Sequence, residues 1–194
     1  MNSREKILAA VKTNQPALRQ LPQLEGLDAI QYADKPEQFS MVLKTIGGTV
    51  VAIKDTDAII EYVNNNFSNH KNYVTTLADL DPIKKLDEHL SPHFLENIEV
   101  AIINALFAVA ENGAVWLTND EMRIRALPFI CEHLVVVLNK KDIVNNMKEA
   151  YGLIGDSAYD FGVFIAGPSK TADIEQSLVL GAHGPKTMTV FIKE

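Results

Sequence analysis

The sequence contains a single cysteine, Cys131, among 194 residues. One thiol excludes an intrachain disulfide, a Cys-rich zinc site and an iron–sulfur cluster held by this chain alone, because such a cluster normally takes four thiolates. The five histidines show no metal-ligand spacing, so we expect no metal on this chain. Cys131 follows apolar residues, and we interpret it as a buried small hydrophobe and not as a nucleophile.

Long apolar runs, basic charge and nucleotide-binding motifs are also missing. No stretch of about 20 apolar residues occurs and the first residues lack the apolar core of a signal peptide, which predicts a soluble, cytoplasmic protein without membrane insertion. Lys and Arg number 18 against 25 Asp and Glu, a net charge of -7, and this balance disfavours nucleic acid as a partner. Neither G-x-G-x-x-G nor G-x-x-x-x-G-K-[ST] is found, which excludes these two nucleotide-binding signatures.

The composition, with 47% hydrophobic and 22% charged residues, is that of a globular protein, and the length suits one domain. Asn2 and Glu5 predict the capping box of an N-terminal amphipathic helix, and prolines interrupt the segment that follows it. We therefore expect an N-terminal helical arm over residues 1–33 and a single α/β domain over residues 34–194.

From residue 34 the pattern alternates between helices with a 3.6-residue period and short apolar strands. Residues 98–118 are almost continuously apolar but contain an Asn-Gly turn signal, so we expect three short strands there. The predicted helices cover residues 34–46, 55–63, 140–151 and 169–180, and the other predicted strands cover residues 49–53, 73–77, 133–138, 162–166 and 187–192. This alternation predicts an α/β fold with a largely parallel sheet.

The segment Gly167–Asp173 is the strongest candidate for a ligand site. It follows a predicted strand and begins a predicted helix, whose N-terminal N–H groups favour a carboxylate or phosphate. Ser169 and Thr171 add hydroxyl groups and Lys170 adds a positive charge. The alternative is that Ser169 only caps the helix and that Asp173 only complements its dipole.

Three further residues carry side chains suited to catalysis or binding. His183, between two glycines, is suited to acid–base chemistry, or else is a loop histidine bonded to backbone. Glu111, in a Glu-Asn-Gly turn, is suited to act as a nucleophile or base, or is a surface turn residue. Arg125 is suited to grip a carboxylate, or pairs with nearby acids. The candidate catalytic residues are Glu111, Asp173 and His183, and the candidate anion-binding residues are Arg125, Gly167, Ser169, Lys170, Thr171 and Gly184.

Residues 162–192 resemble the lactate-utilisation protein C family, which contains the LUD domain. Members of this family carry G-P-S-x-T-A-D-I-E followed by G-x-H-G-P, and here these stretches stand at residues 167–175 and 181–185. Upstream, the family's A-E-T-G turn, arginine and Leu-Pro are matched by Ala110-Glu111-Asn112-Gly113, Arg125 and Leu127-Pro128. Asn112 departs from the family's threonine.

The resemblance implies a three-layer α/β/α fold with a mainly parallel sheet, similar to the sugar-phosphate isomerase and CoA-transferase superfamily. It also implies a part in the oxidation of L-lactate to pyruvate beside two partner proteins that hold iron–sulfur clusters. With one cysteine, this chain would carry no cofactor itself, and the clusters would lie on the partner subunits.

Three hypotheses about function remain open at this point. The first is a subunit of the lactate-oxidising system that binds a small carboxylate or supports the iron–sulfur partners. The second is a CoA-transferase-like enzyme that uses Glu111, because CoA-transferases of the related fold use a glutamate in a similar turn. The third is a non-catalytic adaptor.

Overall fold

The computed structural model describes residues 2–20, 26, 28–69, 71–81, 83–87, 92–171, 179–181 and 183–194. Its centre is a five-stranded sheet in the order β1-β11-β6-β3-β2, in which every pairing is parallel. The strands are β1 (Thr49–Ile53), β2 (Tyr73–Thr75), β3 (Val100–Asn104), β6 (His133–Asn139) and β11 (Thr187–Lys193). The predicted parallel α/β sheet is therefore confirmed.

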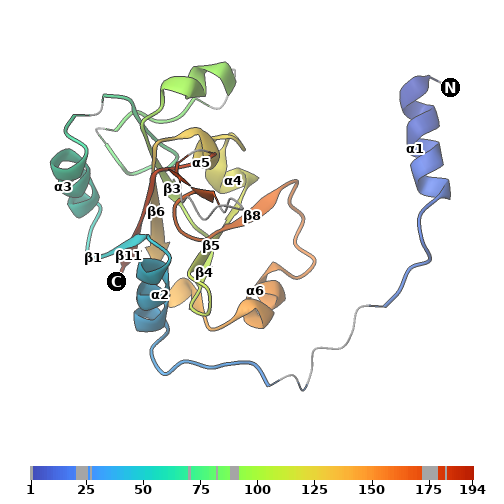
Figure 1. Cartoon of the computed structure of the whole chain (residues 1–194), viewed down its shortest axis with the longest axis horizontal. Helices are drawn as coiled ribbons and strands as arrows, with labels where there is room; N and C mark the ends of the chain where they lie inside the picture. Colours follow the sequence, from blue (N-terminus) through green and yellow to red (C-terminus); the bar gives the residue numbers. More distant parts are fainter. Residues whose placement is uncertain are drawn as a thin grey trace.

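The central strands are apolar because both faces of the sheet are covered. Five consecutive residues of β6 are buried, as expected for a strand in the middle of a parallel sheet. On one face lies α3 (Asp57–Asn66), which packs Ile59 and Val63 against the sheet. On the other face lies α2 (Lys35–Thr45), which buries Phe39 and Leu43. Figure 1 shows these helices on either side of the sheet, which gives the expected three-layer arrangement.

A second sheet of four strands, in the order β7-β4-β5-β8, packs beside α2. Its strands are β4 (Phe107–Val109), β5 (Ala114–Thr118), β7 (Ile143–Val144) and β8 (Gly162–Ile165). β4 and β5 form the hairpin expected in residues 98–118, with Gly113 at a positive φ of 71° in its turn. The outer face of this sheet is covered by α6 (Met147–Ile154).

Several short elements lie in the connections between the strands. They are α4 (Asn119–Met122), α5 (Leu127–Ile130), the 3-10 helices η1 (Pro92–Asn97) and η2 (Lys140–Asp142), and a two-stranded ribbon of β9 (Lys170–Thr171) and β10 (Val179–Leu180). α4 starts with a capping box between Thr118 and Glu121. None of these short elements is predicted from the sequence, because their length depends on contacts with distant parts of the chain.

Two predicted helices are wrong. The helix expected over residues 140–151 starts only at Met147, since Ile143 and Val144 pair with β4 and Asn146 caps the helix. The helix expected over residues 169–180 is replaced at both of its described ends by the antiparallel strands β9 and β10. In addition, β8 runs antiparallel to β5 in the second sheet and does not belong to the parallel sheet.

The N-terminal helix α1 (Ser3–Thr13) forms with the expected capping box between Asn2 and Glu5. None of its residues is buried, and Figure 1 shows it standing apart from the sheets. The division into an arm over residues 1–33 and a domain over residues 34–194 stays a prediction. In the part of the chain that the structure describes, no helix has the length and apolarity needed to cross a membrane.

Candidate functional site

The turn between β4 and β5 carries Glu111, the predicted nucleophile. The Oε2 atom of Glu111 accepts a hydrogen bond of 2.9 Å from the backbone N–H of Met147, the first residue of α6. The Glu111 side chain is exposed, and its charge complements the positive end of the α6 dipole. This carboxylate therefore caps α6, a local role that the sequence does not reveal.

The two stretches that carry the family resemblance meet at the C-terminal half of α2. A methyl group on Gly113 would lie 3.2 Å from the backbone nitrogen of Leu43, and one on Gly167 would lie 3.0 Å from the carbonyl oxygen of Ile46. Both glycines also have positive φ angles, 71° and 76°. Only glycine fits this combination of backbone angle and close approach.

From Gly167 the chain crosses the loop that contains His183. The N–H of Ser169 donates to the carbonyl of Pro185 at 2.9 Å, and its carbonyl accepts from the N–H of Gly181 at 3.2 Å. We call this contact between residues 167–170 and 181–185 the loop crossing. It brings five predicted site residues together, namely Gly167, Ser169, Lys170, His183 and Gly184.

Ser169, Lys170 and His183 carry the hydrogen-bonding side chains of the loop crossing. Ser169 lies against Gly184, where an added methyl group would come within 3.4 Å of the Ser169 hydroxyl oxygen. Lys170 and His183 are both exposed. A hydroxyl, an ammonium and an imidazole are groups that bind carboxylates by charge-assisted hydrogen bonds.

The predicted anion site at a helix N-terminus is nevertheless wrong in its geometry. Ser169 caps no helix, because its backbone N–H and carbonyl pair with the loop at residues 181–185, and Lys170 and Thr171 form β9. The Lys170 ammonium instead approaches the C-terminal end of α2, 3.7 Å from where a methyl group on Gly47 would lie. A lysine there complements the negative end of the α2 dipole.

Arg125, another predicted anion-binding residue, is not part of this cluster. Asp173 lies outside the described residues. Arg125 follows β5, whereas Glu111 and Gly113 precede it, so the two positions lie at opposite ends of that strand. The Nε atom of Arg125 donates to the Asn119 side chain at 2.9 Å, and its guanidinium lies 5.4 Å from the centre of the Phe161 ring.

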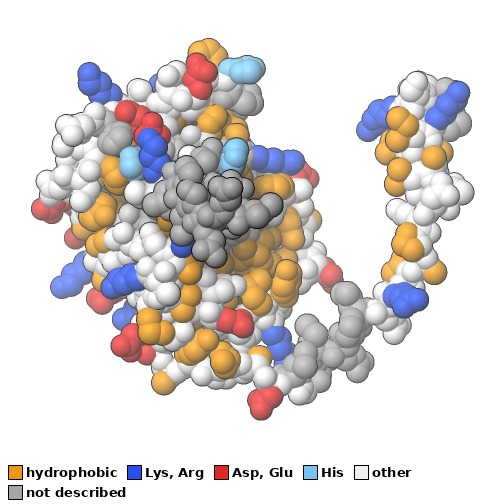
Figure 2. Space-filling model, in the orientation of Figure 1, with side chains coloured by type: hydrophobic (Ala, Val, Ile, Leu, Met, Phe, Trp, Pro, Cys, Tyr) orange, Lys and Arg blue, Asp and Glu red, His pale blue; other side chains and the backbone are white. Residues whose placement is uncertain are grey.

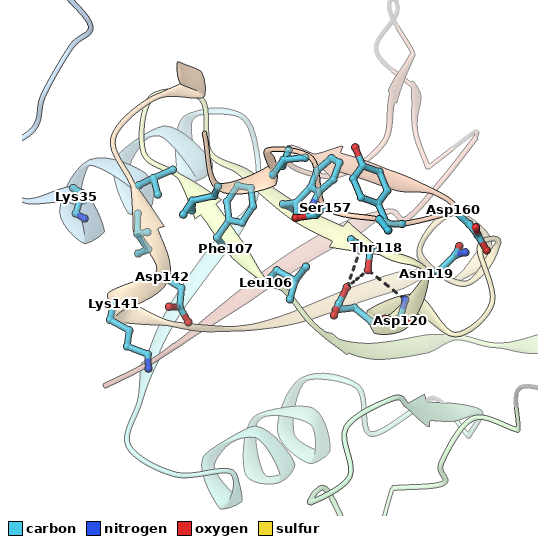
Figure 3. Close-up of a pocket in the computed structure, with 18 residues that line it drawn as sticks. Lys35, Leu106, Phe107, Thr118, Asn119, Asp120, Lys141, Asp142, Ser157 and Asp160 are labelled. Carbon is cyan, nitrogen blue, oxygen red and sulfur yellow. Dashed lines mark hydrogen bonds between the residues drawn. The ribbon is translucent and has the colours of Figure 1, made fainter. Parts of the chain in front are cut away.

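A cavity of about 940 Å³ lies on the outer side of the second sheet, away from the loop crossing. Leu106, Phe107 and Trp116 contribute apolar side chains to its wall, and Leu153 and Ile154 contribute others from α6. Figure 3 shows Asp142 and Lys141 on one side of it and Asp120 and Asp160 on the other. Sequence reasoning missed this cavity, because its walls come from five separate segments.

The thiol of Cys131 lies in the core of the protein. Cys131 is 1% exposed, and this burial raises its pKa to about 12 against weaker opposing effects of backbone hydrogen bonds. The interpretation of Cys131 as a buried hydrophobe is therefore confirmed. Among the described residues, no group of three or more His, Cys, Asp or Glu side chains is placed to hold a metal ion.

Comparison with known proteins identifies relatives of this chain. Residues 69–192 match the LUD domain family. "Lactate utilization protein C" of Oceanobacillus iheyensis is 31% identical over 104 residues, which cover 50% of this chain and 44% of that protein. "Lactate utilization protein C" of Bacillus pumilus is 33% identical over 102 residues, which cover 46% of this chain and 42% of that protein. The matched part thus spans less than half the length of these relatives.

A solved structure is similar over most of the chain. It is the crystal structure of a DUF162 family protein from Deinococcus radiodurans, with a TM-score of 0.65. It is 16% identical and the likeness covers 86% of this chain and 100% of that chain. At this level of identity the likeness supports the fold, including the three-layer arrangement, and says nothing about a ligand.

Proposed function

This chain belongs to the LUD domain family, and from that premise we propose that it serves in the utilisation of L-lactate. Its part is to bind a small carboxylate at the loop crossing or to support partner subunits that hold iron–sulfur clusters. The observation that carries this proposal is the family match over residues 69–192. Relatives named for lactate utilisation support the choice of substrate.

The chemistry of the loop crossing is suited to a small hydroxy or oxo acid. The Lys170 ammonium and the Ser169 hydroxyl supply donors for a carboxylate, and His183 supplies a donor or acceptor for the hydroxyl or carbonyl oxygen at the neighbouring carbon. Gly167 and Gly184 leave room for backbone and side chain to approach closely. These groups bind and orient an acid, whereas the removal of electrons is assigned to the partner subunits.

Calorimetric titration of the purified protein with L-lactate and with pyruvate tests the binding role. We expect Ser169→Ala to weaken binding about tenfold or more, because a hydrogen bond to a charged group contributes about 1.5–3 kcal/mol. Ser157→Ala is the matched control: the same substitution in the 940 Å³ cavity, away from the loop crossing, is expected to leave the affinity unchanged. Absence of heat with both acids contradicts binding at this site.

A pull-down with iron–sulfur subunits of the lactate-oxidising system tests the supporting role. Tagged protein is incubated with these subunits under anaerobic conditions, and retained iron is measured together with the partner polypeptides. We expect stoichiometric retention that survives His183→Ala, since that substitution removes ligand binding and not the fold. If neither acid binds and neither partner is retained, the proposed function is wrong.

A further inference from the structure

The apolar face of α1 has no partner within the described part of the chain. Ile7, Leu8 and Val11 are 63%, 52% and 56% exposed, and their spacing places them on one side of the helix. Figure 2 shows hydrophobic side chains on this helix, with Lys and Arg side chains near its end. An isolated helix of this length is marginal in water, and its stability comes from packing an apolar face.

The 940 Å³ cavity has apolar side chains in its wall, onto which the apolar face of α1 can pack. Of these apolar side chains, Leu106 and Leu153 remain 45% and 58% exposed. Around it, acidic residues outnumber basic ones: Asp120, Glu121, Asp142 and Asp160 against Lys35 and Lys141. Figure 3 shows how the three aspartates flank the apolar residues from opposite sides.

The charge of α1 is opposite to that of the cavity rim. Arg4, Lys6 and Lys12 outnumber Glu5, the one acidic residue of the helix. A basic helix with an apolar face complements an apolar groove with an acidic rim, and such complementarity guides docking and sets its orientation.

The path of the chain indicates that the groove belongs to another molecule. Residues 30–32 are fixed to the start of α6: the Asn146 amide donates to the Ile30 carbonyl at 2.8 Å, and the Tyr32 N–H donates to the Asn145 side chain at 2.9 Å. α1 itself stands apart from the two sheets of its own chain (Figure 1). A fully extended chain of the length between Thr13 and Lys35 would reach on the order of 70 Å, enough to cross to a neighbour.

We propose that α1 of one copy docks into the 940 Å³ cavity of a second copy, so that two chains exchange their N-terminal helices. The exchange is reciprocal, because each chain supplies one helix and one cavity, and a two-fold axis then closes the assembly as a dimer. Leu8 and its neighbours on α1 contact the apolar wall, and the basic residues of α1 face the aspartates.

Sedimentation velocity of the full chain over a range of concentrations is the first test. We expect a dimer that Leu8→Asp dissociates, with a dissociation constant raised at least tenfold, because a charge replaces a buried leucine. Ala9→Asp is the matched control: it adds the same charge on the opposite side of α1 and leaves the dimer intact. A monomer at all concentrations, or equal effects of the two substitutions, overturns the proposal.

Disulfide trapping identifies the groove. The variant with Leu8→Cys and Leu153→Cys is oxidised at micromolar concentration and analysed by mass spectrometry, with Ala9→Cys and Leu153→Cys as the control. We expect covalent dimers joined between residues 8 and 153, formed at least tenfold faster than in the control. A crosslink within one chain, or no preference over the control, overturns docking into a second copy.

Discussion

Ser169 and Gly184 show how closely the two loops approach one another at the loop crossing. A methyl group on Gly184 would lie 3.1 Å from the Cβ atom of Ser169, closer than most side-chain contacts. The backbone of Gly184 does not have a positive φ, so a larger residue there is opposed by contact and not by backbone strain. The size of these two residues therefore sets the geometry of the proposed carboxylate site.

Gly184→Ala is expected to destabilise the protein by about 1–3 kcal/mol, the usual cost of inserting a methyl group into a close contact. Thermal unfolding measures this as a fall in Tm of about 2–4 °C for each kcal/mol in a chain of this size. Adding Ser169→Gly makes room for the new methyl group and restores part of the loss. No recovery in the double variant contradicts a direct contact between these positions.

Two substitutions of Glu111 separate its role as a cap of α6 from a catalytic role. Glu111→Gln keeps an oxygen that accepts the Met147 N–H, so we expect a Tm within about 1 °C of the original protein, whereas Glu111→Ala loses about 1 kcal/mol. Both variants are then incubated with acyl-CoA and searched for a mass adduct on residue 111. The original protein is treated in the same way. An adduct that forms on Glu111 and is missing from both variants supports the CoA-transferase hypothesis.

Cys131 is expected to resist alkylation in the folded protein. Its burial and its pKa of about 12 leave almost no thiolate at pH 8, and the thiolate is the reactive form. Mass spectrometry after treatment with iodoacetamide is predicted to show unmodified native protein and complete modification in denaturant. Rapid modification under native conditions contradicts the packing described for Cys131.

At the scale of the elements, Glu149 links α6 by hydrogen bonds to the segment that precedes α2. Its carboxylate accepts hydrogen bonds from the backbone N–H of Asn145 at 2.8 Å and from the Gln31 side chain at 3.0 Å. Burial raises the pKa of Glu149, but these hydrogen bonds and the charge of Lys35 outweigh it and leave the pKa below its usual value. The ionised form therefore stabilises the fold.

This shift predicts a pH dependence of stability. Because the pKa of Glu149 is lower in the folded than in the unfolded chain, its contribution is present above about pH 4.3 and is lost as the pH falls through the folded-state pKa. Glu149→Gln is expected to lower Tm near neutral pH and to reduce the further fall in Tm on acidification to about pH 3. A parallel pH profile for both proteins contradicts this role.

Local sequence signals predict elements well where tertiary contacts agree with them. α2 is predicted because Asp34 caps it, Pro36 suits its first turn and Phe39 and Leu43 share its buried face, and all three features are present in the structure. β1 and β6 are predicted because short runs of β-branched residues are typical of buried parallel strands.

The errors arise where pairing between distant segments determines the structure. Ser169 and Asp173 have the pattern of a helix cap, but the backbone of Ser169 pairs with Gly181 and Pro185. Ile143 and Val144 fit a helical period, but they pair with Ala108 and Val109. A strand of two residues carries too little local signal to be predicted, so the helix expected after Gly167 was wrong, whereas the assignment of the site residues stays a prediction.

At the scale of the whole molecule, the proposed carboxylate site and the proposed docking groove are separate. None of the described residues of the loop crossing lines the 940 Å³ cavity, and α1 lies outside the matched LUD domain. Deletion of residues 2–20 is therefore expected to abolish dimer formation and to change the affinity for L-lactate less than twofold. Sedimentation and calorimetry on the same sample check both, and a joint loss contradicts their separation.

The most direct test of the central claim is a crystal structure of the protein with bound L-lactate. The account predicts electron density for one molecule of the acid at the loop crossing, with its carboxylate within hydrogen-bond distance of Ser169 or Lys170 and its hydroxyl facing His183. Density for the acid only elsewhere, or an empty loop crossing at saturating L-lactate, would contradict the claim.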